Sequence, residues 1–131
     1  MRYPIVIHKD EGSGYGVTVP DLPGCFSAGD TFDQALDSAQ EAIECHIEGL
    51  LMANDPIPEP NAINEKEYPG ATWAIVAVDL SKLGGKTRRI NITVPENLLN
   101  RFDEFAQKSG EPSRSGLLVN ATLEYIQKRS A

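Results

Sequence analysis

The first two thirds of the chain alternate apolar and polar positions in short runs bounded by turn residues, a pattern that predicts β-strands. Four such strands are expected, over residues 3–9, 15–19, 25–28 and 71–80. The last run is apolar on nearly both faces, so we expect it to lie inside a sheet rather than at its edge.

A long helix is expected between the third and fourth strands. Asp30 or Thr31 can cap its start, and Asn54-Asp55-Pro56 ends it. Its apolar positions recur every three or four residues, so one face packs on the sheet: Phe32, Ala35, Leu36, Ala39, Ala42, Ile43, Ile47, Leu50 and Leu51. The order β-β-β-α-β predicts an α+β domain over residues 1–80, followed by a linker over 81–87.

The remaining residues, 88–131, combine one alternating strand with two helical patterns. The strand is Arg88–Val94, Pro95 opens the first helix, Gly110 ends it, and Ser113 is the expected N-cap of the second helix. A single strand has no ladder partner and two helices bury little surface. We therefore expect a second copy of the chain, with the two strands antiparallel across a two-fold axis.

Charge separates the same two regions. Residues 1–85 hold 14 acidic and 4 basic side chains, a net charge of −10, whereas residues 86–131 hold 5 acidic and 8 basic ones, a net charge of +3. The contrast indicates two parts with different partners, although two unrelated solvated surfaces would show it as well. The polar face of the paired strands presents Arg89, Asn91 and Thr93 twice, which suits the DNA major groove.

Acidic residues line the side of the long helix opposite its apolar stripe. They recur every three or four positions, at Asp33, Asp37, Glu41, Glu44 and Glu48. At a rise of ~1.5 Å per residue the carboxylates stand ~5–6 Å apart, close to the spacing of phosphates along a nucleic-acid strand. The row could attract a cationic partner that binds RNA, or it could be an ordinary solvated helix face.

Residues 86–129 resemble the ribbon-helix-helix family of DNA-binding proteins, which contains Arc and MetJ. The resemblance rests on the alternating strand, on Val94-Pro95-Glu96, and on Gly110-Glu111-Pro112-Ser113-Arg114-Ser115. It implies that Arg89, Asn91 and Thr93 contact base edges. It also implies phosphate contacts from Lys86, Arg88, Ser113, Arg114 and Ser115. Alternatively, the strand could join the sheet of the first domain, leaving the basic residues merely solvated.

Residues 3–80 resemble the HicB antitoxin family, whose N-terminal part has a partial ribonuclease H-like fold. The residues that carry this are Tyr15-Gly16-Val17-Thr18-Val19-Pro20-Asp21-Leu22-Pro23-Gly24-Cys25, Gly29-Asp30-Thr31 and the alanines of the helix. The resemblance implies a partner, HicA, a small basic toxin that cleaves messenger RNA. It implies toxin neutralisation and repression of the shared operon by a dimer or a tetramer. Besides the acidic helix, a rival toxin surface is the hairpin and third strand, with Asp10, Glu11, Asp21 and Phe26.

Enzymatic activity is not expected, and no cofactor or metal is implied. Metal-dependent nuclease chemistry needs several converging carboxylates, and Asp10, Asp21 and Asp79 lack a fourth partner. Cys25 and Cys45 show no metal-ligand spacing, and no apolar run approaches membrane-spanning length, so we expect a cytoplasmic protein with reduced thiols. Two alternatives to the antitoxin stay open: a stand-alone repressor whose N-terminal domain senses a small ligand, and a nuclease.

Overall fold

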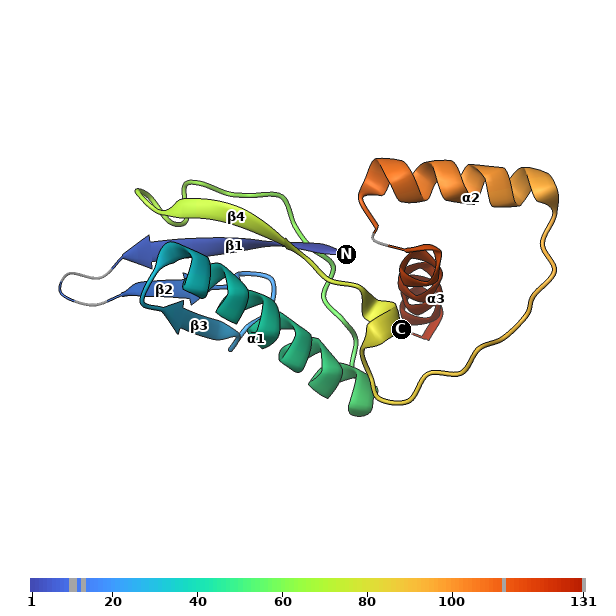
Figure 1. Cartoon of the computed structure of the whole chain (residues 1–131), viewed down its shortest axis with the longest axis horizontal. Helices are drawn as coiled ribbons and strands as arrows, with labels where there is room; N and C mark the ends of the chain where they lie inside the picture. The colour runs from blue at the N-terminus through green and yellow to red at the C-terminus, as the bar shows by residue number, and fades with distance from the viewer. Residues whose placement is uncertain (10–11, 13, 112, 131) are drawn as a thin grey trace. The chain divides into compact units, whose positions relative to one another are not determined.

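The computed structural model describes residues 1–9, 12, 14–111 and 113–130. The chain divides into two compact units, Arg2–Val78 and Asp79–Ala131, the latter together with Met1 (Figure 1). The division lies close to the expected end of the first domain at residue 80, and the second unit includes the whole of the expected linker 81–87. We call the two parts the N-terminal unit and the C-terminal unit.

The described part of the N-terminal unit contains an antiparallel sheet of four strands in the order β3-β2-β1-β4. The strands are β1 (Arg2–Lys9), β2 (Tyr15–Thr18), β3 (Phe26–Gly29) and β4 (Thr72–Ala77). In the register, Val6 lies opposite Thr18 on one side and opposite Trp73 on the other. The strand β1 is therefore the one that hydrogen-bonds to β2 and β4 at once.

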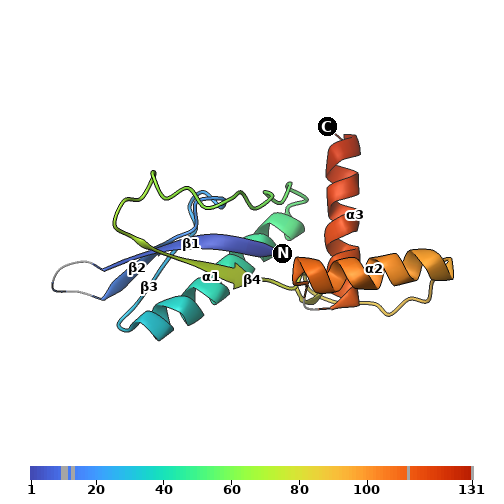
Figure 2. The ribbon, with the colours of Figure 1, turned by 90° about the horizontal axis from the view of Figure 1, so that it is seen from above.

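The helix α1 (Phe32–Met52) packs on this sheet through the apolar stripe that the sequence predicted (Figure 2). Ala35, Ala39, Ile43 and Ile47 are fully buried. Thr31 is the N-cap, in a capping box with Gln34, which satisfies free amides of the first turn. Close contact between helix and sheet depends on Gly29, because a Cβ there would lie 2.4 Å from the amide nitrogen of Ala35.

The expectation that the last strand of this domain lies inside the sheet is wrong, because β4 is an edge strand and β1 is central. One face of β4 is buried and the other is partly exposed: Val76 is buried, whereas Ile75 is 55 % exposed. The loop 57–70 contacts Trp73 on the partly exposed face. Its Tyr68 ring packs edge-to-face on Trp73, with ring centroids 5.8 Å apart. The carbonyl of Pro58 accepts a hydrogen bond of 2.6 Å from Tyr3. Apolar residues on both faces of a strand therefore do not by themselves place it between two other strands.

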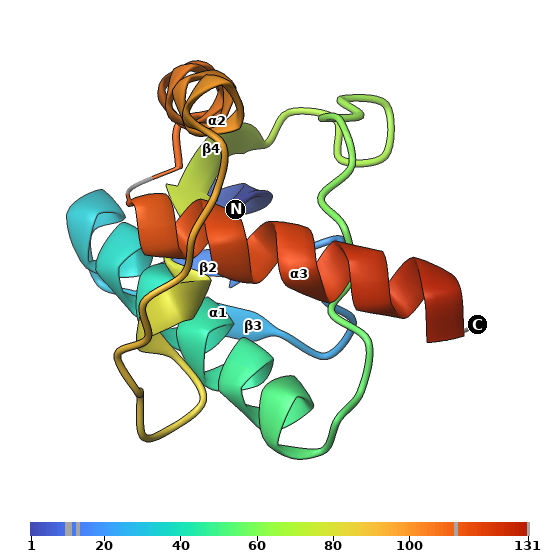
Figure 3. The ribbon, with the colours of Figure 1, turned by 90° about the vertical axis from the view of Figure 1, so that its right-hand side faces the viewer.

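The C-terminal unit contains a short 3₁₀ helix, η1 (Leu80–Lys82), and the helices α2 (Glu96–Ser109) and α3 (Arg114–Ser130). The helix α2 ends at Gly110, which has the left-handed φ of 71° and donates its N–H to the carbonyl of Ala106. The predicted cap of α3 is confirmed, since the Ser113 hydroxyl accepts the N–H of Gly116 at 2.9 Å. The two helices cross steeply (Figure 3).

Residues 83–95, all of which the structure describes, form no strand in the single chain, in contrast to the strand predicted over 88–94. A strand exists only with a hydrogen-bonded neighbour, which one copy of this segment does not have. Several apolar side chains of the C-terminal unit are also exposed. They are Ile90, Ile92, Val94, Leu98, Phe105, Leu118, Tyr125 and Ile126. The pairing of two copies therefore stays a prediction.

Candidate DNA and toxin interfaces

The segment 86–94 exposes both its polar and its apolar residues. The basic and polar side chains Arg89, Asn91 and Thr93 alternate with Ile90 and Ile92, and all five are exposed. Ile90 and Ile92 are 64 % and 59 % exposed, which is unfavourable for isolated aliphatic side chains in water. If the segment were paired as a ribbon, the alternation would direct its polar residues to one face and its isoleucines to the other.

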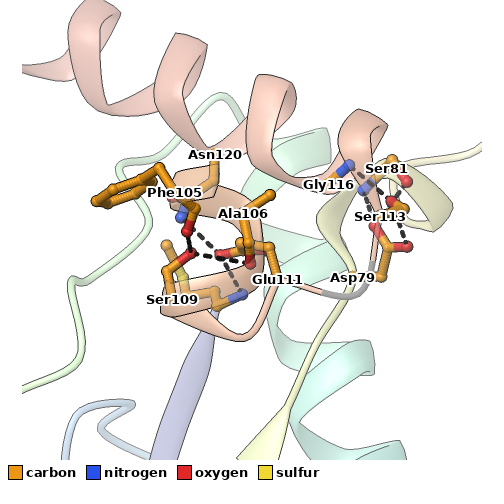
Figure 4. A network of polar contacts seen from close by, with 10 residues as sticks. Asp79, Ser81, Phe105, Ala106, Ser109, Glu111, Ser113, Gly116 and Asn120 are labelled. Atoms are coloured by element: carbon orange, nitrogen blue, oxygen red, sulfur yellow. Dashed lines mark hydrogen bonds and ion pairs between the residues drawn. The ribbon is translucent and has the colours of Figure 1, made fainter. Parts of the chain in front are cut away.

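The start of α3 is built around the carboxylate of Asp79 (Figure 4). One of its oxygens, Oδ2, accepts the Ser113 hydroxyl at 3.1 Å. The other, Oδ1, accepts the backbone N–H of Ser81 at 3.0 Å and the Ser81 hydroxyl at 2.6 Å. Burial would raise the pKa of Asp79, but the hydrogen bonds from Ser81 and Ser113 and the charge of Lys82 outweigh it and hold that pKa below its ordinary value. The side chain is therefore an anion at neutral pH.

Arg114, the first residue of α3, is also held by a carboxylate. Its Nε donates to Asp103 Oδ1 at 3.1 Å, and its Nη2 donates to Asp103 Oδ2 at 2.9 Å. This bidentate pair is exposed, with 64 % and 41 % of the two side chains accessible, so its contribution to stability is small. Ser113 and Arg114, which the resemblance assigned to a DNA phosphate, thus both contact acidic side chains of the same unit, and Ser115 is exposed.

The contacts of Asp79 with Ser113 and of Asp103 with Arg114 were not predicted from the sequence, which placed Asp79 on a strand. A local signal did exist for the contact of Asp79 with Ser81. Asp79-Leu80-Ser81 is a typical Asx turn, in which the aspartate caps the amide two residues later, and here it is the N-cap of η1. The contact with Ser113 had no such signal, because 34 residues separate the two positions.

The acidic row of α1 lies largely on its solvent side. Asp33, Asp37 and Glu41 are exposed, whereas Glu44 and Glu48 are half-buried. Glu44 accepts a hydrogen bond of 2.8 Å from Gln40 Nε2. The exposed part of the row is therefore its first three residues.

The rival surface is described only in part, because Asp10 and Glu11 lie outside the described residues. Asp21 is tied to the covering loop, since it accepts both the backbone N–H of Asn61, at 3.1 Å, and its side-chain amide, at 2.6 Å. Phe26 lies on the edge strand β3 and is 67 % exposed. Of these two described residues, Phe26 is the one available to a partner.

Within the described ranges, no group of three or more His, Cys, Asp and Glu side chains could hold a metal ion. Cys25 is buried and Cys45 is exposed, and neither forms a disulfide. Burial raises the pKa of the Cys25 thiol. None of the helices in these ranges has the length and apolar character needed to cross a membrane.

The geometry thus defines a two-part protein: an α+β unit with an acidic helix, and a helical unit with a basic, partly apolar segment. Comparison with known proteins identifies its family. The model of a family described as a HicB-like antitoxin of bacterial toxin–antitoxin systems matches residues 3–122. An uncharacterized 14.9 kDa protein from the rep-hol intergenic region of Haemophilus phage HP1 is 50 % identical over 109 residues, which are 80 % of this chain and 81 % of that protein.

Two solved structures extend the comparison. The Burkholderia pseudomallei antitoxin HicB is 42 % identical with a TM-score of 0.74, over 96 % of this chain and 98 % of that one. A chain of a HicA3 and HicB3 toxin–antitoxin complex is 34 % identical with a TM-score of 0.51, over 60 % of this chain and 99 % of that one.

The chain belongs to the HicB-like antitoxin family of bacterial toxin–antitoxin systems. Its named relatives are antitoxins, a class without enzymatic activity. The resemblance of the N-terminal residues to HicB is therefore confirmed. The ribbon-helix-helix assignment, the ribonuclease H-like assignment and the site residues stay predictions.

Proposed function

We propose that this chain neutralises a HicA-type toxin in the cytoplasm through its N-terminal unit and represses its own operon through its C-terminal unit. Family membership supports the first part, together with the similarity to a chain of a HicA3 and HicB3 complex. The net charge of −10 over residues 1–85 supports it further, because a nuclease that binds RNA presents a basic surface. The alternative of a stand-alone, ligand-sensing repressor is not favoured by this family.

The toxin surface that we favour combines Phe26 with the exposed first half of the acidic row, Asp33, Asp37 and Glu41. An exposed aromatic side chain supplies the apolar area of a typical interface hot spot. The carboxylates speed the encounter with a cationic partner and orient it. A solvated helix face would make the same charge pattern without binding anything, so removal of the charges decides between the two.

The single observation that carries the DNA-binding part is the uncovered apolar surface of the C-terminal unit. Its residues Ile90 and Ile92 are exposed beside the basic Arg88 and Arg89, and α2, all of which is described, buries no side chain fully. Two copies that pair their 88–94 segments would bury the isoleucines and direct Arg89, Asn91 and Thr93 outward, twice over. Such a ribbon fits the major groove. Lys86, Arg88 and the start of α3 would then contact phosphates.

Two measurements test the two parts separately. Expression of a HicA-type toxin should arrest growth, and co-expression of this chain should restore it. A reporter driven by the DNA upstream of the gene should be repressed by the full chain. Growth arrest that persists would contradict the antitoxin role, and a reporter that stays unrepressed would contradict the DNA-binding role.

A further inference from the structure

We propose that the toxin binds by strand addition at β3: an extended, basic segment of the HicA-type toxin joins the sheet as a further strand beside β3. The proposal rests on the proposed antitoxin function and names the conformation and the chemistry of the toxin segment that binds. Apolar side chains of that segment would lie against Phe26, and its basic side chains would lie beside α1.

The strand β3 has one side without a hydrogen-bonded neighbour. It pairs with β2, and in the described ranges no strand pairs with its other side. The N–H of Val19 donates to the carbonyl of Cys25 at 3.3 Å. Because bonded and non-bonded pairs alternate along antiparallel strands, the next bonded residue of β3 in this register is Ser27. Phe26 and Ala28 therefore direct their backbone N–H and C=O groups away from β2, and both residues are exposed.

Phe26 and α1 lie on opposite faces of the sheet. Residues directly opposite one another on neighbouring strands share a face, and the row that starts at Phe26 continues through Thr18, Val6 and Trp73. Trp73 contacts the loop 57–70, and this loop and α1 cover opposite faces of the sheet (Figure 2). The edge strand between the two faces is thus the place where one partner segment can touch both Phe26 and α1.

The first half of α1 supplies carboxylates close to this edge. The helix begins soon after β3 and contacts that strand more extensively than β2 or β4. Asp33, Asp37 and Glu41 are exposed, and within the part of the chain that the structure describes none of the three forms an ion pair. These carboxylates are therefore available to a cationic partner.

A groove connects the acidic side chains to the edge strand. Its volume is about 530 Å³, and Ala28 of β3 and Gln34 of α1 are among its lining residues. Of the described residues that line it, Asp30 and Asp37 are acidic and none is basic. Pockets of this volume accept small molecules. A lysine or arginine side chain of a strand added to β3 can therefore enter the groove and meet the two carboxylates.

The chemistry of the partner segment follows from these positions. Side chains of a strand alternate between its two faces, so the segment needs apolar residues on the face of Phe26 and lysine or arginine on the face of α1. Main-chain hydrogen bonds would supply affinity, and the alternate side chains would supply specificity. A second copy of this chain fits less well, because self-pairing of β3 would bring two acidic helices together, each in a unit of net charge −10 over residues 1–85.

The direct test is hydrogen exchange of backbone amides, followed by NMR on the full chain with and without the HicA-type toxin of the growth assay. We expect exchange at Phe26 and Ala28 to slow at least about tenfold in the complex, because their N–H groups become hydrogen-bonded. Ser27, whose N–H faces β2, is the internal control and should change little. Equal slowing at all three residues would show general coverage in place of strand pairing and would overturn the proposal.

The backbone contact is tested further with Ala28→Pro, which removes one outward N–H and keeps the hydrogen bonds between β2 and β3. Its affinity for the toxin should fall at least about fivefold, because a carbonyl of the toxin segment loses its donor. Ala28→Val is the matched control, since it enlarges the same side chain and keeps the N–H. Equal losses in the two variants, or none in Ala28→Pro, would contradict strand pairing. If Ala28→Pro does not fold, the exchange measurement decides without a variant.

The groove is tested by removing both of its carboxylates in the double variant Asp30→Asn, Asp37→Asn. Toxin affinity at low salt should fall at least about tenfold, because a basic side chain in the groove loses its counter-charges. The control is Asp55→Asn, Glu59→Gln, which makes the same change of net charge at exposed positions after α1. Equal losses in the two double variants would assign the effect to net charge and exclude the groove.

Three results separate this inference from the proposed function. A chain that binds no toxin would contradict the proposed function, and the inference with it. Toxin binding without slower exchange at Phe26 and Ala28 would overturn the pairing at β3 and leave the antitoxin role intact. Slow exchange at both amides in the absence of toxin, growing with the concentration of the chain, would assign the edge to a second copy and would also overturn the proposal.

Discussion

The two units of this chain differ in how far their apolar side chains are buried. The N-terminal unit buries them: Tyr3, Ile5, Ile43 and Ile47 have no exposed surface. The C-terminal unit exposes several of them, and Leu80 and Leu117 are its buried large apolar residues among those described. The first unit therefore has a core of its own, whereas the second exposes apolar side chains that a single copy of the chain does not cover.

Removal of residues 86–131 should have the largest effect, and it tests whether the N-terminal unit folds without the C-terminal unit. We expect the remaining chain to keep its fold, because the buried residues of its sheet and α1 all lie before residue 79. It should lose DNA binding completely and retain toxin binding. Circular dichroism, cooperative unfolding and a toxin pull-down check this. A remnant without a cooperative transition would contradict the independence of the N-terminal unit.

Truncation of a core side chain should have the next largest effect. Ile43→Ala is expected to lower the free energy of unfolding of the N-terminal unit by about 2–5 kcal/mol, because Ile43 is fully buried. The control is Ile126→Ala in the C-terminal unit, where the side chain is 52 % exposed. Urea unfolding followed by far-ultraviolet circular dichroism measures the difference, since both units contain helices. Similar losses in both variants would remove the contrast between the units.

A charged side chain introduced into the segment 88–94 should weaken the association of two copies of the chain without unfolding either copy. Ile92→Asp is expected to weaken dimerisation at least about tenfold, because a carboxylate would be buried in the paired ribbon. Ile75→Asp is the control, since Ile75 is exposed to a similar degree, 55 % against 59 % for Ile92, but lies on β4. Sedimentation equilibrium measures both. Unchanged association in Ile92→Asp would exclude the ribbon as the dimer interface.

Base reading by the ribbon is tested with Arg89→Ala. The variant should lose about 1–3 kcal/mol of operator binding and show a relaxed base preference, while toxin neutralisation is unchanged. Arg129→Ala is the control, because that guanidinium lies over the Tyr125 ring, 4.6 Å from its centroid, far along α3 from the proposed contacts. Equal losses on operator and random DNA would assign Arg89 to a phosphate instead of a base.

The smallest expected effect is the dependence of the stability of the C-terminal unit on pH in the acidic range. Because the pKa of Asp79 is lower in the folded chain than its ordinary value, its ionisation stabilises the C-terminal unit above about pH 4. That contribution, below about 1 kcal/mol for a partly exposed group, is lost as the pH falls through the folded-state pKa. Asp79→Asn should therefore be slightly less stable than the unmodified chain at pH 7 and equal to it in acid. Thermal unfolding at the two pH values measures this.

The sequence predicted the elements well wherever local chemistry decides them. The stripe of α1, its cap at Thr31, the end of α2 at Gly110 and the cap at Ser113 are all found in the structure. Each depends on residues within a few positions of one another. The family resemblance of the N-terminal residues had the same local basis, in the turn before Cys25 and the glycines before α1.

Features that depend on distant residues were not predictable in this way. The position of β4 at the sheet edge did not follow from its own residues, because a strand can carry apolar residues on both faces without lying between two others. The exposed segment 88–94 forms no ladder in one chain, because hydrogen bonds between strands need two of them.

By itself, then, the sequence determined which residues form helices and turns, which side of each element is apolar, and how charge is divided between the two halves. Only the tertiary structure decided that Asp79 meets Ser113 and that Asp103 meets Arg114. The physical reason is that side-chain hydrogen bonds form between groups that folding brings within about 3 Å, whatever their separation along the chain.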